Sequence, residues 1–313
     1  GTLVAPAEFV PIIPGESVKD TAELSEQEVL KSRAGREISE LTGIKVGGSI
    51  SFEANYQETD LLWALLFGGT CSVSGSNPYV HTVLLGEDIT RSLSLHLEKM
   101  VNVWSISGVK INTASFSISA DSPVGVFSLD GITAKSVEHS TTHRTALTNL
   151  ADPGKPRILW HHSVVRIGNL SGALGSSHIQ EVNSIEISIN NNLAIDQRDA
   201  TTGLYVVEPL RSGRREITVN FNLPRYKADT LYGFYVAGTP IQMDIRFTRG
   251  IYYLLLEFPT LIVKEFTAAA GDAGIIPVSV SLQDYRNESN THMATITEEC
   301  RLTIANDRTT QIW

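Results

Sequence analysis

The sequence has 313 residues, of which 42% are hydrophobic and 19% charged, and its formal net charge is −9. This balance is typical of a folded globular protein, and the length favours two domains over one. The acidic charge argues against a surface built to grip phosphates, so tight nucleic-acid binding is disfavoured.

Cysteine content and hydropathy narrow the class further. Cys71 and Cys300 are too few for a disulfide framework and predict a reducing compartment. Residues 1–14 lack the pattern of a signal peptide, and the longest strongly apolar run, 251–258, is too short to cross a bilayer. We therefore expect a soluble product of the cytoplasm with no membrane segment.

The first 36 residues differ from the rest. Pro6, Pro11 and Pro14 interrupt them, and the stretch that follows is charged. Residues 21–36 could form a short helix, but its apolar face is thin. We expect an extended N-terminal arm that either docks on another molecule or stays loosely ordered.

Apolar and polar residues begin to alternate near residue 44. Ile50 and Phe52 alternate with polar neighbours, and so do the three leucines of 93–97. This period of two predicts half-buried antiparallel strands. Further strands are predicted at 101–106, 109–119 and 124–129. The apolar positions change parity within 109–119, which predicts a β-bulge.

A short helix is predicted at 60–69, with the sequence DLLWALLFGG. Thr59 or Asp60 can cap its start, and Gly68 or Gly69 can end it in the left-handed conformation. Because this helix of about two turns is apolar almost all round, we expect it to be buried across one side of a sheet.

The stretch 138–176 is rich in His, Thr, Asn and Gly. It predicts a connector between domains, with one strand at 157–167. A second strand-rich region then begins with the alternating isoleucines of 185–189.

This second region repeats the first when the chain is shifted by 169 residues, so that 50–69 falls on 219–238 without a gap. Phe52 aligns with Phe221, and Trp63 with Tyr232. The later elements recur in the same order, with 93–97 matching 241–247, 101–119 matching 251–266, and 124–129 matching 278–282. We predict an N-terminal arm (1–36), a first β-domain (37–137), a connector (138–176), a second β-domain (177–290) and a C-terminal strand or tail (291–313). Two such domains could alternate around a ring, so three chains would form a pseudo-sixfold circle joined at strand edges.

Candidate chemical sites are sparse. His139, His143 and the pair 161–162 lack carboxylates or cysteines at supporting spacing, so we interpret them as polar loop residues rather than metal ligands. The glycines of 168–175 lack the lysine of a phosphate loop and favour a linker. There is no Gly-x-Ser-x-Gly elbow and no Cys–His setting for a nucleophile.

Two further charged groups have simple interpretations. Glu298 and Glu299, beside Cys300, fall in a predicted terminal strand, where neighbours point to opposite faces and cannot act on one substrate. The arginines at 211, 214 and 215 either form salt bridges with a neighbouring subunit or lie in a solvated loop. We thus predict no catalytic, cofactor-binding or metal site, no cofactor, and no enzymatic activity.

Several stretches resemble the two-domain tail tube proteins of long-tailed bacteriophages. They are GGSISFEANYQETDLLWALLFGG at 47–69, ITRSLSLHLEK at 89–99 and NTASFSISADSPVGVFSLDG at 112–131, followed by REITVNFNLPRYKADTLYGFYVAG at 215–238 and PVSVSLQDY at 277–285. The resemblance covers roughly 40–285. It implies a mainly β fold of two tandem sandwich- or barrel-like domains, each with a short buried helix.

The resemblance also implies a function and partners. The chain would be a structural subunit of the virion tail, made in the host cytoplasm and stacked in rings around a channel for genome delivery. Its partners would be further copies of itself, tape-measure and tail-terminator proteins, and double-stranded DNA that passes without tight binding, with no membrane involved. The arm at 1–36 and the connector are candidates for locking one ring to the next.

Some alternatives stay open at this point. Glu98, Asp244 and Arg246 could face the channel, an interface or solvent. Another self-assembling virion or secretion-system β-protein is possible, and so is a receptor- or carbohydrate-binding β-module. A sugar-binding module is expected to expose clustered aromatic residues, but Trp63 lies on the helix predicted to be buried, and Trp104 and Trp160 are isolated.

Overall fold

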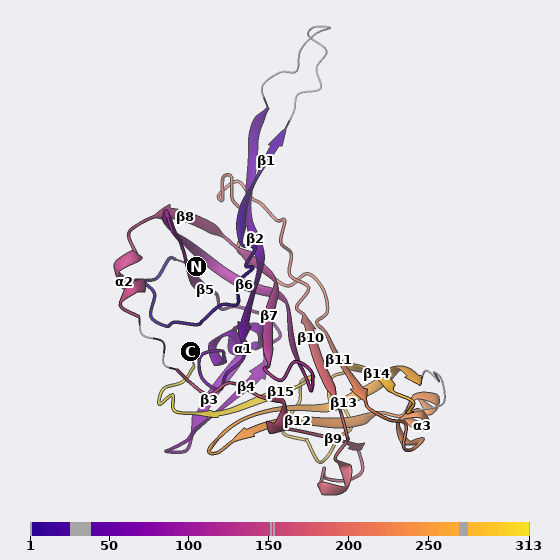
Figure 1. The fold of residues 1–313 in the computed structure, drawn as a ribbon. Helices are drawn as coiled ribbons and strands as arrows, with labels where there is room; N and C mark the ends of the chain where they lie inside the picture. The colour runs from indigo at the N-terminus through magenta and orange to yellow at the C-terminus, as the bar shows by residue number, and fades with distance from the viewer. Residues whose placement is uncertain (1, 26–38, 151, 153, 269–274, 313) are drawn as a thin grey trace, which may run out of the picture.

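The computed structural model describes residues 2–25, 39–150, 152, 154–268 and 275–312 (Figure 1). Strands dominate and the helices are short, so the mainly β class is confirmed. In chain order the elements are β1 (Lys19–Ser25), β2 (Glu40–Glu53), α1 (Asp60–Phe67), β3 (Gly68–Ser74), β4 (Tyr79–Leu85), β5 (Leu93–Lys99), β6 (Asn102–Ser119), β7 (Val126–Ala134), β8 (Ser136–Ser140), α2 (Arg144–Thr148), the 3-10 turn η1 (Trp160–His162), β9 (Ser163–Asn169), the 3-10 turn η2 (Ser176–His178), β10 (Ser184–Asn190), β11 (Glu216–Leu223), α3 (Thr230–Ala237), β12 (Ile241–Arg249), β13 (Tyr252–Ala268), β14 (Val278–Asp284) and β15 (Arg301–Asn306).

One long antiparallel sheet joins both halves of the chain. Its strand order is β1-β2-β7-β6-β10-β11-β14-β13, and β10 lies between the two halves (Figure 1). The first part of β13 also pairs with β12 and β15, and β15 continues the sheet to β4 and β3. The first part of β6 similarly pairs with β5 and β8.

The two longest strands, β6 and β13, each pass from one set of partners to another. The change in β6 occurs at register irregularities between Ile111 and Ala114, and the change in β13 between Val263 and Glu265. An extra residue bends a strand and increases its twist, which lets one strand serve two layers. The bulge predicted in 109–119 is therefore confirmed, although 101–106 and 109–119 belong to one strand.

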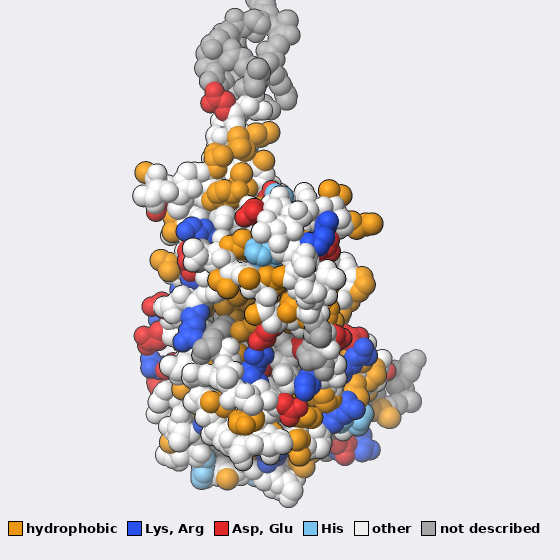
Figure 2. Space-filling model, turned by 90° about the vertical axis from the view of Figure 1, so that its left-hand side faces the viewer, with side chains coloured by type: hydrophobic (Ala, Val, Ile, Leu, Met, Phe, Trp, Pro, Cys, Tyr) orange, Lys and Arg blue, Asp and Glu red, His pale blue; other side chains and the backbone are white. Residues whose placement is uncertain are grey.

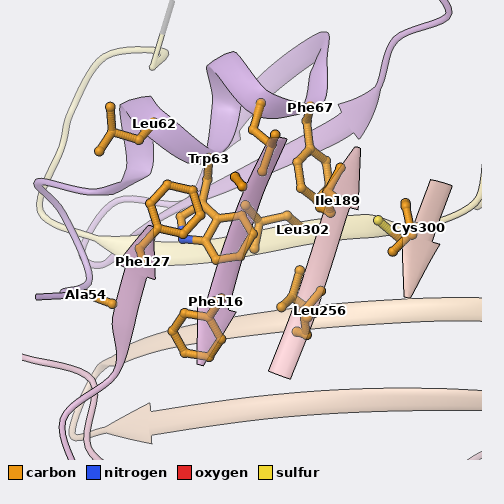
Figure 3. Packing of buried hydrophobic residues seen from close by; sticks show 14 of the residues in the cluster. Ala54, Leu62, Trp63, Phe67, Phe116, Phe127, Ile189, Leu256, Cys300 and Leu302 are labelled. Atoms are coloured by element: carbon orange, nitrogen blue, oxygen red, sulfur yellow. The ribbon is translucent and has the colours of Figure 1, made fainter. Parts of the chain in front are cut away.

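The core of the first half forms around α1. Trp63 is 1% exposed, and its ring centroid lies 4.5 Å from that of Phe127 and 5.9 Å from that of Phe116 (Figure 3). The helix ends at Gly68, whose φ of 68° is the left-handed conformation that glycine adopts without steric cost. The predicted buried helix is confirmed here.

The second half repeats the first strand by strand. In the first unit β6 pairs with β5, β7 and β8, and in the second unit β13 pairs with β12, β14 and β15 in the same roles. The order β1-β2-β7-β6 in the long sheet recurs as β10-β11-β14-β13. The repeated order of elements predicted from the sequence is thus present in the fold.

The two equivalent helices differ in burial. Both end at a left-handed glycine, Gly68 and Gly238, so the helices correspond with an offset of 170 residues rather than 169. Gly233 therefore stands where α1 has Trp63, and only Leu231 of α3 is buried. The expectation of a buried helix in both domains is wrong for α3. Strands β3 and β4 separate α1 from the next strand and pack on it, whereas α3 leads directly into β12.

Three local predictions need correction. The helix predicted at 21–36 is wrong at its start, because β1 runs to Ser25 in a ladder with β2; residues 26–36 lie outside the described residues. The strand predicted at 157–167 is β9, which begins only after the turn η1. Residues 138–176 also contain part of β8 and the helix α2.

Candidate assembly surfaces

The two faces of the long sheet differ sharply. One buried row crosses six neighbouring strands, consisting of Phe52, Phe127, Phe116, Ile187, Val219 and Leu282. The adjacent row, on the opposite face, consists of Ser51, Ser128, Ser115, Ser188, Thr218 and Gln283. Successive residues of a strand point to opposite faces, so this second row forms an uncharged surface of hydroxyl and amide groups.

Hydrogen bonds and a shallow groove mark the same polar face. The hydroxyls of Ser51 and Ser128 lie 2.9 Å apart, and the Ser115 hydroxyl donates to Asp130 at 2.8 Å. A groove on this face is lined by residues that include Ser117, Glu186 and Asn220. Small side chains of this kind present a smooth, hydrated surface, and the nearby charged groups Asp130 and Glu186 are acidic.

The two units meet where β10 pairs with β6, with Ser188 opposite Ser115. Polar side chains from the second unit satisfy the end of α1 at this junction. The Asn191 amide donates to the Leu66 carbonyl at 3.1 Å, and the Arg215 guanidinium donates to the Phe67 carbonyl at 3.4 Å. These are carbonyls that a helix cannot satisfy internally. Burial lowers the pKa of Arg215 to about 10.

The second half of β13 holds the position that β6 holds at this junction, but nothing equivalent to β10 lies beside it. No described strand pairs with the free edge of β13 over 263–268. At the opposite end of the sheet, the equivalent of β10 is the stretch 12–19, which lies along β2. Ser17 donates from its backbone N–H to the Ser49 carbonyl at 2.9 Å, and Ile12 bridges to Phe52. In the described part of the chain no strand pairs along its outer edge.

A hairpin of β1 and β2 projects from the body of the molecule (Figure 1). Figure 2 shows hydrophobic side chains along its stem, where Leu24 and Leu41 pair across the strands and are 61% and 42% exposed. A projecting stem with exposed leucines is suited to contact another molecule.

Residues 191–215 brace this hairpin. Lys45 lies 2.9 Å from Glu23 and 2.5 Å from Asp196, and Arg198 lies 2.6 Å from Glu23. The hydrogen bonds from Lys45 and Arg198 lower the pKa of Glu23. The backbone N–H of Ile44 also donates to a carbonyl in this segment. Several ion pairs that share partners hold a stem in one direction better than a single exposed pair does.

The histidines singled out in the sequence do not gather in one place. His139 packs edge-on against Trp104, His143 lies 4.7 Å from His96, and His161 and His162 contact each other. No group of three or more metal-ligating side chains occurs within the described residues.

The charged residues left open by the sequence lie away from the polar face. Glu98 is on β5 and pairs with Arg144. Asp244 is buried on β12, where it binds Arg166, and its neighbour Arg246 lies over the ring of Tyr253.

The arginine cluster is only partly in a solvated loop. Arg214 is exposed, but Arg211 and Arg215 are half-buried and both donate to the Gly86 carbonyl. The solvated-loop interpretation is therefore wrong for these two. Glu298 and Glu299 directly precede β15 rather than lying in it.

The serine-rich row was missed by reasoning that concentrated on charged and catalytic residue types. The signal was present as the polar half of each alternating strand. No helix in the described parts of the chain is long and apolar enough to cross a membrane.

Comparison with known proteins identifies the family. A family model described as phage tail tube protein matches residues 1–283. A search of curated proteins gives no match. The solved structures with some similarity include the tail of an empty gene transfer agent particle refined with C6 symmetry, at 14% identity and a TM-score of 0.32, covering 45% of this chain and 99% of that one. The virion of a native gene transfer agent particle gives 12% identity and a TM-score of 0.30, with the same coverage. Because the family match spans most of its length, the chain belongs to the phage tail tube protein family and is a structural subunit of a tail tube.

Proposed function

We propose that copies of this chain close into a ring in which the free edge of β13 pairs with residues 12–19 of the next copy. The observation that carries this proposal is the β6–β10 junction, which joins two equivalent units inside one chain. The same two edges are left unpaired at the outer ends of the described sheet. An exposed strand edge is a template for pairing with another chain, and here the template for the pairing already exists in the fold.

The repeat predicts the register of this contact. The β5–β6 and β12–β13 turns pair Lys99 with Asn102 and Arg249 with Tyr252, which sets an offset of 150 residues between β6 and β13. Glu265 is thus the equivalent of Ser115. Ser17 is the equivalent of Ser188, because each lies beside an equivalent residue of the next strand, Ser49 or Thr218. Ser17 of one copy should therefore face Glu265 of the next.

Three chains per ring follow if each unit occupies one of six similar positions. Each chain supplies one junction internally and one externally, so a closed ring of three has six nearly equivalent junctions and pseudo-sixfold symmetry. In this ring residues 37–137 and 177–290 are the repeated domains, 1–36 the arm, 138–176 the connector and 291–313 the C-terminal strand.

The polar face of the long sheet would line the channel of the ring. Its serine, threonine and glutamine row carries no positive charge that would hold phosphates, so duplex DNA could pass without tight binding during genome delivery. The apolar face stays in the core. This role needs no catalytic residue, cofactor or metal.

Stacking of rings would use the β1–β2 hairpin. Its braced stem and exposed leucines would contact the ring above, and residues 191–215 would hold its direction. Tape-measure and tail-terminator proteins would meet the channel and the last ring, so the mature protein would reside in the virion tail after synthesis in the host cytoplasm.

Engineered cysteines test the register and the ring size together. Under oxidation, the Ser17→Cys/Glu265→Cys variant should form disulfides between copies, and the ladder on a non-reducing gel should end at three chains. The matched variant Ser115→Cys/Ser188→Cys should crosslink within one chain and leave it monomeric on the same gel. Absence of intermolecular links, while the matched pair links, would contradict the proposed junction. A ladder that continues past three chains would contradict the closed ring of three.

A further inference from the structure

Two exposed apolar features lie far apart in the molecule. The β5–β6 turn carries Met100 and Val101, which are 93% and 79% exposed. The other feature surrounds α3, and we call it the α3 face: Tyr226, Tyr232, Tyr235 and Val236, which are 37%, 45%, 40% and 66% exposed. Adjacent apolar groups left in water on this scale mark a surface that another molecule covers.

The equivalent features already meet at the junction inside the chain. Tyr56, in the loop before α1, is 1% exposed and stacks on Tyr252, with ring centroids 6.3 Å apart and planes inclined at 25°. Tyr252 directly follows the β12–β13 turn and donates from its hydroxyl to Asp307 at 2.7 Å. The loop before the first helix is thus covered by a hairpin turn of the second unit.

The repeat carries this contact to the outer junction. The helix offset of 170 places Tyr226 at the position of Tyr56, and the strand offset of 150 places Asn102 at that of Tyr252. Ile251 in the β12–β13 turn corresponds to Val101. Tyr226 and the β5–β6 turn are therefore the two halves of a contact that a single chain cannot complete.

We propose that the β5–β6 turn of one copy, Met100 and Val101, packs on the α3 face of the next copy. This inference rests on the proposed ring and specifies a second contact in it, away from the paired strand edges. The occupant is a second copy of this chain, because both surfaces are apolar and the internal junction brings their equivalents together. Tyrosine is suited to such a contact, since its ring packs while its hydroxyl stays hydrated.

Gly233 agrees with this assignment. Where α1 fills the core with Trp63, α3 has a glycine with no atom within 4 Å of the position that a Cβ would occupy. A helix without a large side chain at this position cannot anchor itself in its own core. Its tyrosines are then available to a neighbouring chain.

The first test is charge placed in the turn. Because Met100 and Val101 are exposed, the Met100→Asp/Val101→Asp variant should keep the thermal unfolding midpoint of the wild-type protomer. Its rate of tube assembly, followed by light scattering and negative-stain microscopy, should fall about tenfold or more. The control Ile179→Asp changes another residue that is 51% exposed and should assemble at the wild-type rate. Normal assembly of the double aspartate variant would overturn the inference.

The second test is a crosslink that separates this inference from the ring itself. Val101→Cys/Tyr226→Cys should form a disulfide between copies under the conditions that link Ser17→Cys/Glu265→Cys. If the Ser17/Glu265 pair links and the Val101/Tyr226 pair does not, the turn contact is wrong and the ring stands. If neither pair links copies, both the ring and the turn contact are wrong.

Discussion

Arg308 binds both carboxylate oxygens of Asp60, with Nε 2.8 Å from Oδ2 and an Nη 2.9 Å from Oδ1, although the residues are 248 positions apart. Asp60 is fully buried at the first turn of α1, and Asn306 donates to the same carboxylate at 2.9 Å. Arg308 also binds Glu8, so one guanidinium connects the N-terminal stretch, the first helix and the C-terminal stretch. Burial raises the pKa of Asp60, and Arg308 opposes that shift.

Removal of this guanidinium should destabilise the protomer strongly. Arg308→Ala leaves the Asp60 carboxylate buried without its partner, and we expect a loss of about 3–5 kcal/mol in the free energy of unfolding. Arg225→Ala is the matched control, because Arg225 and Glu181 form an exposed pair, and it should cost less than about 1 kcal/mol. Equilibrium denaturation of both variants measures the difference; equal losses would contradict the structural role given to Asp60.

The two helices should respond differently to truncation. Trp63→Ala removes a fully packed indole and should cost about 3–5 kcal/mol in the free energy of unfolding. Tyr232→Ala, on the exposed helix α3, should cost less than about 1 kcal/mol in the isolated protomer. Chemical denaturation of the unassembled protomers compares them, and a large loss for Tyr232→Ala would show that α3 is anchored in the core.

His81 should make the protomer sensitive to acid. Burial lowers the pKa of His81, whose Nε2 donates to the Arg308 carbonyl at 3.0 Å. Below the ordinary histidine pKa of about 6.5 the unfolded chain binds the proton more readily, so the contribution of His81 is fully present above that pH and is lost as pH falls towards the folded pKa.

The variant His81→Gln keeps an amide donor but cannot titrate. Between pH 7 and 5, its unfolding midpoint should fall less than that of the wild type, as measured by thermal denaturation at a series of pH values. Because other groups titrate identically in both proteins, the difference between the two curves isolates His81. Parallel curves would remove His81 as the cause.

Charge on the hairpin stem should separate stacking from ring closure. Leu24→Asp/Leu41→Asp changes two exposed residues, so protomer stability should change by less than about 1 kcal/mol. When this pair of changes is combined with Ser17→Cys/Glu265→Cys, the three-chain crosslink should persist while electron micrographs show short stacks or single rings. Tubes of normal length would exclude the stem from the contact between rings.

A lysine on the polar face should slow the passage of DNA. Ser188→Lys places positive charge on the row proposed to line the channel, and each phosphate contact adds about −0.9 to the slope of log affinity against log salt. Virions that carry this variant should eject DNA more slowly at low salt than at high salt. Ser177→Lys, in the turn η2, is the control and should eject at the wild-type rate. Equal rates for the two variants would place Ser188 outside the channel.

Much of the fold could be predicted because its signals are local. Alternation in 50–53 and 185–189 identified strands and their buried faces, and the parity change after Ile111 located a bulge. The apolar run ending at Gly68 identified α1, and the order of elements revealed the duplication. In each case a residue's neighbours in the sequence are also its neighbours in the element, so the pattern itself carries the information.

The contacts that make the assembly surfaces were decided by the tertiary structure. Nothing local indicates that β10 pairs with β6, that Arg308 binds Asp60, or that β1 forms a hairpin stem rather than a helix. Strand pairing joins residues that are distant in the sequence, and its choice depends on which edges the whole fold leaves available. The sequence by itself therefore determined the strands, their buried faces and the repeat. The fold alone decided which face is the polar surface of a continuous sheet, and which edges and turns remain for another copy.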